Sequence, residues 1–369
     1  MSLRLDLPGP LRRRGPRPLW LHLGLTQPVQ PGATPPDPTS IDKALLAGIA
    51  AYRRHPDQRE LTDPPIIWQE GESRLLDYGK QGGLPVLFVP SLINRAYVLD
   101  LLPERSMLRW LAGHGIRPLL FDWGWPGLVE RRFDLTAAIG RLERAVLARR
   151  NKVVLAGYCM GGLLTVALAQ RRPERVRGLA LLATPWDFHA EQAQDSVAQI
   201  AVALGAGLPA MEPLMHLSGT LPVDALQTLF ASVEPGSVAA KFRAFGRLDP
   251  TSPAARDFVA LEDWLNDGTP LAAPIAREVF SGWYRDNLPG LGKWLVEGTA
   301  VMPQALRCPA FVAVPARDRI VPPATAMALA GLIDGATLHQ PAAGHVGMVA
   351  GPRAQAALWQ PLLDWLRRL

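Results

Sequence analysis

The sequence contains few cysteines and no long apolar run, and both absences narrow what the protein can be. Only Cys159 and Cys308 are present, so no disulfide framework can form, and we expect a reducing, cytoplasmic setting. No apolar stretch approaches the ~20 residues that a helix needs to cross a bilayer, so we expect no transmembrane segment. The seven histidines show no metal-ligand spacing and no phosphate-binding glycine loop is present, so we expect no metal and no cofactor.

Most of the chain also carries almost no net charge. The net charge is +6, but residues 1–60 hold nine Lys+Arg against five Asp+Glu and account for +4 of it. The remaining sequence is close to neutral, which argues against nucleic acid as a partner. With 48% hydrophobic residues in 369, the chain can build a large core.

The domain organisation follows from changes in composition. Residues 1–39 are rich in Pro, Gly and Arg and predict a basic, partly disordered leader. Ser40 is the predicted N-cap of a helix over residues 41–54. We expect a sheet domain over residues 40–185 and again over 301–369. The loop-rich, helical pattern between them, with no convincing strand, predicts an inserted helical cap at residues 186–300.

Short apolar runs alternate with helical patterns through the two sheet segments. Strands are predicted at residues 85–90, 117–121, 152–156, 176–183, 310–314 and 336–338, and helices at 94–114, 134–149, 162–172 and 352–368. Such alternation is typical of a mostly parallel sheet with helices on both faces. The predicted fold class is therefore α/β.

The strongest local signal is Gly157-Tyr158-Cys159-Met160-Gly161-Gly162, which lies between a predicted strand and a helix of small residues. This is the context of the nucleophile elbow in α/β-hydrolases, where a tight turn lifts the nucleophile above the sheet. The sequence therefore predicts an α/β-hydrolase fold with Cys159 as the nucleophile. A buried structural cysteine is the alternative interpretation.

The predicted acid and base follow the nucleophile in the order that this fold uses. Asp318 comes just after the strand at 310–314, and His345 follows the last strand signal. We expect His345 to take the thiol proton and Asp318 to orient the imidazole. The predicted oxyanion donors are the backbone N–H of Met160 and, from the loop after the strand at 85–90, that of Ser91 or Leu92.

These segments resemble those of a known family, the polyhydroxyalkanoate synthases and their α/β-hydrolase relatives. The resemblance rests on residues 89–101, 122–126, 157–162, 184–188, 317–322 and 344–347. It extends over about residues 41–369 and is strongest at the sheet. The cysteine within the elbow is its most specific element, because most relatives of the fold carry serine there.

The resemblance implies an acyltransferase that moves 3-hydroxyacyl groups from coenzyme A to a growing polyester chain through thioesters on Cys159. Coenzyme A then enters only as part of the substrate. The chain is similar in size to synthases that need another subunit, which implies a partner synthase subunit or a homodimer. The candidates for lining an apolar substrate pocket are four tryptophans, with core packing as the alternative: Trp123, Trp125, Trp186 and Trp283.

Two other functions stay open at this point. A cysteine-dependent hydrolase of thioesters, esters or stored polyester would use the same three residues with water as the acceptor. A non-catalytic protein of the polyester granule surface would instead use the basic leader and the tryptophan-rich cap for contact. Cysteine favours transfer, since a thioester retains the activation of the acyl group for the next ester bond.

Overall fold

The computed structural model describes residues 13–19, 42–190, 209–233 and 236–369, and the chain divides into two compact units. The first consists of residues 1–60 and 234–267, and the second of residues 61–233 and 268–369. Most of the predicted leader, residues 1–39, lies outside the described residues, as does Ser40. No described helix is long and apolar enough to cross a membrane.

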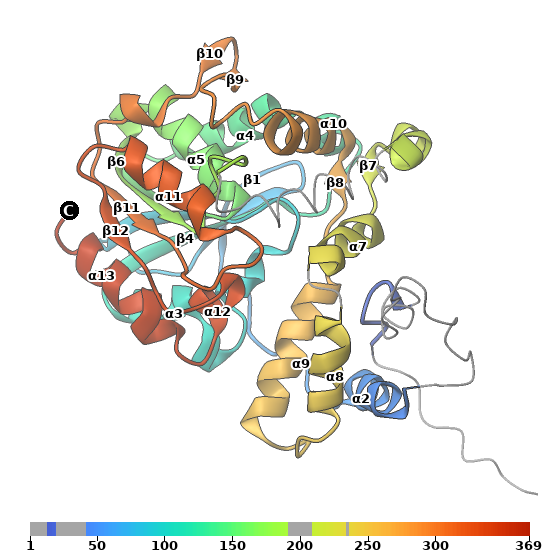
Figure 1. Ribbon diagram of the computed structural model, residues 1–369. Helices are drawn as coiled ribbons and strands as arrows, with labels where there is room; N and C mark the ends of the chain where they lie inside the picture. The colour runs from blue at the N-terminus through green and yellow to red at the C-terminus, as the bar shows by residue number, and fades with distance from the viewer. Residues whose placement is uncertain (1–12, 20–41, 191–208, 234–235) are drawn as a thin grey trace, which may run out of the picture. The chain divides into compact units, whose positions relative to one another are not determined.

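The second unit is built on an eight-stranded sheet in the order β1-β2-β4-β3-β5-β6-β11-β12 (Figure 1). Its strands are β1 (Ile66–Glu70), β2 (Ser73–Asp77), β3 (Leu84–Val89), β4 (Ile116–Asp122), β5 (Val153–Tyr158), β6 (Val176–Leu182), β11 (Ala310–Ala313) and β12 (Thr337–His339). All neighbouring pairs from β4 to β12 are parallel, and β2 pairs with β1 and β4 in antiparallel fashion. The predicted α/β class with a mostly parallel sheet is confirmed.

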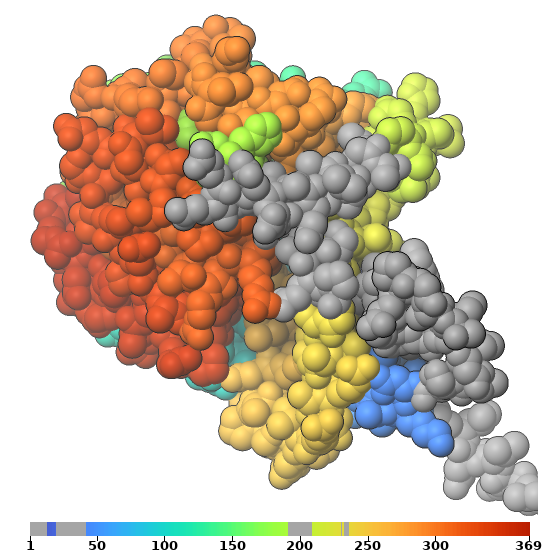
Figure 2. Space-filling view, viewed as in Figure 1, coloured from blue at the N-terminus to red at the C-terminus, as the bar shows by residue number. Residues whose placement is uncertain are grey.

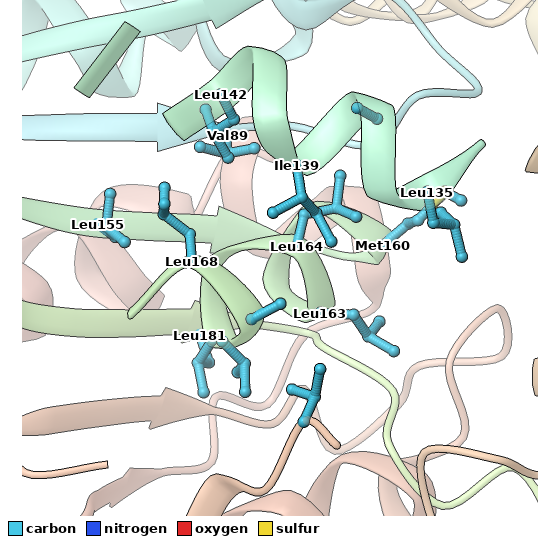
Figure 3. Close-up of a cluster of buried hydrophobic side chains, with 14 of the residues drawn as sticks. Val89, Leu135, Ile139, Leu142, Leu155, Met160, Leu163, Leu164, Leu168 and Leu181 are labelled. Atoms are coloured by element: carbon cyan, nitrogen blue, oxygen red, sulfur yellow. The ribbon is translucent and has the colours of Figure 1, made fainter. Parts of the chain in front are cut away.

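Helices cover both faces of this sheet. The main helices are α3 (Met107–Gly113), α4 (Leu135–Leu147), α5 (Met160–Arg171), α11 (Pro323–Leu332), α12 (His345–Ala350) and α13 (Gln360–Leu366). On one face α4 and α5 bury leucines against Val89, Leu155 and Leu181 (Figure 3). On the other face α13 places Trp365 against Phe311 of β11, with ring centroids 5.7 Å apart. In the space-filling view, the last part of the chain forms one continuous side of this unit (Figure 2).

The predicted helix over residues 94–114 is wrong. Its place is taken by two short 3-10 turns, η1 (Ala96–Leu99) and η2 (Pro103–Arg105), followed by α3. The cause is the buried carboxylate of Asp100, which accepts hydrogen bonds from the Ser106 hydroxyl at 2.6 Å and from Arg109 Nε at 2.7 Å. Ser106 then caps α3 by accepting from the Arg109 N–H, so the helix begins only there.

The middle of the chain also contains strands that the sequence pattern does not reveal. They are two pairs of two-residue strands, β7 (Thr220–Leu221) with β8 (Leu271–Ala272) and β9 (Leu295–Val296) with β10 (Thr299–Ala300). The helices of this region are α7 (Val223–Val233), α10 (Ala273–Arg277) and the π-helical segment η6 (Glu278–Arg285). The cap at 186–300 stays a prediction as a domain, since residues 234–267 of it are grouped with the N-terminal unit.

The first unit has a core of its own, made by α2 (Lys43–Arg54), α8 (Ser237–Phe245) and α9 (Pro253–Asn266). Asp42, rather than the predicted Ser40, caps α2 by accepting from the Leu45 N–H at 2.9 Å. The Tyr52 hydroxyl donates to Asp263 at 2.9 Å, and Arg13 forms an ion pair with the same carboxylate. A buried phenol and a guanidinium therefore share one acid in this unit.

Candidate active site

Cys159 occupies the turn between β5 and α5, at the carboxyl end of a central strand. Its backbone has φ 55° and ψ −127°, a conformation that costs an L-residue of order 1–3 kcal/mol and persists only where the surroundings impose it. The Cys159 N–H donates to Leu182 O at 2.9 Å, and its carbonyl accepts from the Gly162 N–H at 2.9 Å. Both backbone bonds hold the side chain at the top of the turn.

The glycines around Cys159 are required by close packing. A Cβ on Gly157 would lie 2.4 Å from the Gly162 Cα, and one on Gly161 would lie 2.1 Å from Val89 O. A Cβ on Gly162 would lie 1.9 Å from the Thr184 hydroxyl oxygen. Only hydrogen fits at these three positions, so the small residues of the motif follow from the contact of α5 with the ends of β3, β5 and β6.

Asp318 and His345 lie together, joined by a hydrogen bond of 2.7 Å between Oδ2 and Nδ1. The second carboxylate oxygen of Asp318 accepts from the N–H groups of Ile320 and Val321, both at 2.9 Å. The Asp318 side chain is fully buried. The acid is thus fixed from both sides and presents one oxygen to the imidazole, as the order of the three residues in the sequence predicts.

His345 is buried between two groups that can carry negative charge. Burial by itself would lower its pKa, but the charges of Asp318 and Cys159, and hydrogen bonds to both, raise the pKa to about 10. Since Nδ1 faces Asp318, Nε2 is the nitrogen left for the Cys159 sulfur. The arrangement therefore stabilises an imidazolium beside Cys159, and a cysteine nucleophile reacts as its thiolate.

Two tyrosines near Cys159 are not singled out by sequence reasoning. The Tyr158 ring lies 5.1 Å from the His345 ring, and its hydroxyl donates to His345 O at 3.4 Å. Tyr284, on η6, packs edge-on against Phe188 at 4.8 Å. Burial first, and then the charge of Cys159, raises the pKa of both phenols, so both stay neutral donors at physiological pH. Tyr158 could have been found from its place beside the nucleophile, whereas Tyr284 carries no such signal.

The predicted oxyanion residues lie on two adjoining segments. Met160 is the first residue of α5, where backbone N–H groups have no partner within the helix. Ser91 lies in the loop after β3 with its hydroxyl 3.9 Å from the Met160 sulfur, and it accepts from the Ile93 N–H at 3.2 Å. The Thr269 hydroxyl donates to Leu92 O at 3.1 Å and holds this loop. The choice between the N–H groups of Ser91 and Leu92 stays a prediction.

The four predicted pocket tryptophans differ in burial, and their place in a substrate pocket stays a prediction. Trp186 and Trp283 are 1% and 2% exposed and pack in the core against Trp294, whereas Trp125 is 46% exposed. Trp123 lines a cavity of about 40 Å³, together with Leu92 and Ile275. This space holds about one water molecule. Trp123 also fixes the loop after β3, because its indole N–H donates to Pro90 O at 3.1 Å.

Cys308 lies apart from this site, at the entrance of β11. Burial raises the pKa of its thiol, which makes it a poor nucleophile. Within the described parts of the chain, no three or more His, Cys, Asp or Glu side chains gather in a way that could hold a metal ion.

Comparison with known proteins supports the resemblance inferred from the motifs. A family described as "alpha/beta hydrolase fold" matches residues 148–352. The chain is 28% identical over 319 residues to the poly(3-hydroxyalkanoate) polymerase subunit PhaC of Haloferax mediterranei, covering 82% of this chain and 63% of that one. It is 27% identical to the subunit of the same name from Allochromatium vinosum, covering 81% and 87%. The predicted similarity to polyhydroxyalkanoate synthases is confirmed, although the chain spans less than two thirds of the Haloferax relative.

Solved structures agree on the fold. A monoacylglycerol lipase from Paleococcus ferrophilus aligns with a TM-score of 0.51 at 17% identity, covering 80% of this chain and 98% of that one. A carboxylesterase from the Thaumarchaeon Nitrososphaera gargenis aligns with a TM-score of 0.51 at 12% identity, covering 82% and 99%. At such identities the likeness concerns the fold alone.

Proposed function

The chain belongs to the α/β-hydrolase fold family, and from that premise we propose that it is an acyltransferase of the polyhydroxyalkanoate synthase type. The substrate would be a 3-hydroxyacyl-CoA thioester, and the acceptor the hydroxyl end of a polyester chain. The observation that carries the proposal is a cysteine, rather than a serine, in the strained elbow position beside a hydrogen-bonded His345–Asp318 pair. The similarity to proteins named as polymerase subunits supports the choice of substrate.

In the proposed first half-reaction, His345 takes the proton of the Cys159 thiol through Nε2. The thiolate attacks the thioester carbonyl, and the oxyanion that forms is stabilised by the N–H of Met160 and by that of Ser91 or Leu92. The bond between the carbonyl carbon and the sulfur of coenzyme A breaks, and the departing sulfur receives the proton from His345. The hydroxyacyl group is now a thioester on Cys159.

In the second half-reaction, the acceptor hydroxyl gives its proton to His345 and attacks the Cys159 thioester. The new ester bond forms as the cysteine leaves as a thiolate. Asp318 supports the imidazolium in both steps, because its carboxylate lies 2.7 Å from Nδ1. Exchange between two thioesters is nearly isoenergetic, so the activation of the acyl group is kept until the ester forms. If the nucleophile were serine, the acyl group would be held as an oxygen ester and most of its activation would be lost.

The product decides between transfer and hydrolysis. Purified protein is incubated with 3-hydroxybutyryl-CoA, and coenzyme A release and the acyl product are both followed. Formation of polymer would support the proposal. Formation of free hydroxy acid would instead indicate a hydrolase that uses the same residues. No release of coenzyme A, with or without added partner protein, would contradict the proposed activity and favour a granule-surface role.

The proposed synthase works with a second subunit. This rests on the relatives, which are named as subunits of a polymerase. Its proposed place is the cytoplasm, at the surface of the growing polyester. Copurification of the tagged chain from its source cells, followed by size measurement, would separate a partner complex from a homodimer.

A further inference from the structure

A basic concavity lies at the end of the sheet away from Cys159. It consists of two adjoining cavities of about 870 and 340 Å³, which share Pro85 and Asn151. Most of the residues that line them lie at or just before the start of β3, β4, β5 and β6, or at the end of α13 and just after it. Because β5 separates this end from Cys159 by six residues at ~3.3 Å each, the two sites are ~20 Å apart. A ligand here does not reach the thiol.

The lining of these cavities is strongly positive. Lys152, Arg177 and Arg367 line the larger cavity, and Arg117, Arg149 and Arg150 the smaller one. No aspartate or glutamate lines either cavity. Arg149, Arg150 and Lys152 lie within four residues of one another, and the fold brings Arg117, Arg177 and Arg367 to the same cavities from distant segments.

Three of these six cations have an internal partner, and Arg367 donates to His114 O at 3.5 Å. Arg117 forms an ion pair with Asp77 at 2.6 Å, and Arg177 donates to Leu369 O at 2.6 Å. For Arg149, Arg150, Lys152 and Arg367, the structure shows no ion pair with any described carboxylate. Like charges gathered in this way repel one another and favour an anion that bridges them.

The cavity also offers an apolar wall beside the charges. Leu84, Pro85, Ile116 and Leu366 line the larger cavity together with the His114 ring. That ring is itself supported by Trp110, with ring centroids 4.0 Å apart. A volume of this size falls within the ~300–1,000 Å³ usual for small-molecule sites. Arginines match the geometry of phosphate oxygens, whereas the apolar wall suits a planar ring.

We propose that this concavity is a second ligand site, which binds a nucleotide-type organic phosphate. The phosphates contact Arg149, Arg150 and Lys152, and the heterocycle lies against the apolar wall and His114. The proposal does not depend on the reaction at Cys159, because the two sites are at opposite ends of β5.

Titration calorimetry with ATP tests this proposal on the full chain. The variant is Arg150→Glu with Lys152→Glu, both at exposed positions. The matched control is Arg132→Glu with Lys293→Glu, which makes the same change in net charge at exposed residues that line neither cavity. We expect saturable binding of ATP to the wild type and at least tenfold weaker binding to the variant. The control should bind ATP within twofold of the wild type.

Two further measurements complete the test. Coenzyme A, which carries the same adenosine and diphosphate groups, should displace ATP, whereas inorganic pyrophosphate should need at least tenfold higher concentration. Pyrophosphate as effective as ATP would overturn the nucleotide assignment. Absence of saturable ATP binding, or equal weakening in variant and control, would overturn the site itself. Both variants should have the same thermal unfolding midpoint as the wild type, which establishes that they are folded.

Discussion

Replacing Asp318 with asparagine would remove one negative charge beside His345 at almost unchanged side-chain size. The Asp318 carboxylate accepts from Ile320 and Val321 through one oxygen and contacts His345 Nδ1 through the other. An asparagine can keep both backbone bonds through its carbonyl oxygen, so the loop should retain its shape. The neutral amide would then face the imidazole, and the support for the imidazolium would be lost.

The expected size of the effect follows from the pKa of His345. That pKa is about 10 against an ordinary 6.5, and the charges of Asp318 and Cys159 together outweigh a burial effect of opposite sign. At 1.36 kcal/mol per pKa unit, this net difference corresponds to roughly 5 kcal/mol, so the interactions of His345 with Asp318 and Cys159 together supply at least that much. If Asp318 supplies about half, its loss costs about 2–3 kcal/mol. We therefore expect kcat/KM to fall roughly 30- to 150-fold.

Two assays in a Cys308→Ser background measure this effect. One is kcat/KM for coenzyme A release from 3-hydroxybutyryl-CoA, and the other is the rate of Cys159 alkylation by iodoacetamide, each followed from about pH 5 to about pH 10. Asp334→Asn is the matched control, since it removes one charge from an exposed residue. Wild-type rates in Asp318→Asn, or equal losses in both variants, would refute the role of Asp318.

Three other outcomes can be measured on the same protein. Gly162→Ala should lower the free energy of unfolding by about 1–3 kcal/mol or more in chemical denaturation, because the new Cβ would meet the Thr184 side chain. An unchanged midpoint would show that α5 can shift. Tyr158→Phe should lower kcat less than about tenfold, since it removes only a long 3.4 Å bond to His345 O, and a larger loss would mean that Tyr158 acts in catalysis. Because its pKa is raised, His345 should contribute stability that is fully present below about pH 6.5 and is lost as pH rises through about 10, and this loss should be smaller in Asp318→Asn.

The sequence predicts the sheet and the elbow because both leave local signals. The buried strands appear in the sequence as short apolar runs. The glycines around Cys159 are required by contacts with residues a few positions away or with the end of an adjacent strand. The sequence pattern does not reveal the hairpin of β1 and β2, because its strands are short and no residue of β1 is fully buried. The turn at Gly71, which has φ 54°, was its only clear signal.

The features that failed or were missed depend on contacts between distant segments. The helix at 94–114 is broken by the buried Asp100, whose hydrogen bonds to Ser106 and Arg109 cannot be inferred from periodicity. Tyr284 comes near Cys159 only because η6 packs against Phe188. The basic concavity gathers cations from several loops, although the average charge of the same region is almost neutral.

The most direct test of the central proposal is to identify the residue that carries the acyl group. The protein is mixed with 3-hydroxybutyryl-CoA, quenched in acid within one turnover, digested and examined by mass spectrometry. The proposal predicts a hydroxybutyryl adduct on the peptide that contains Cys159, and no adduct in Cys159→Ala. An adduct on Cys308 or on a serine, or turnover by Cys159→Ala at the wild-type rate, would contradict it.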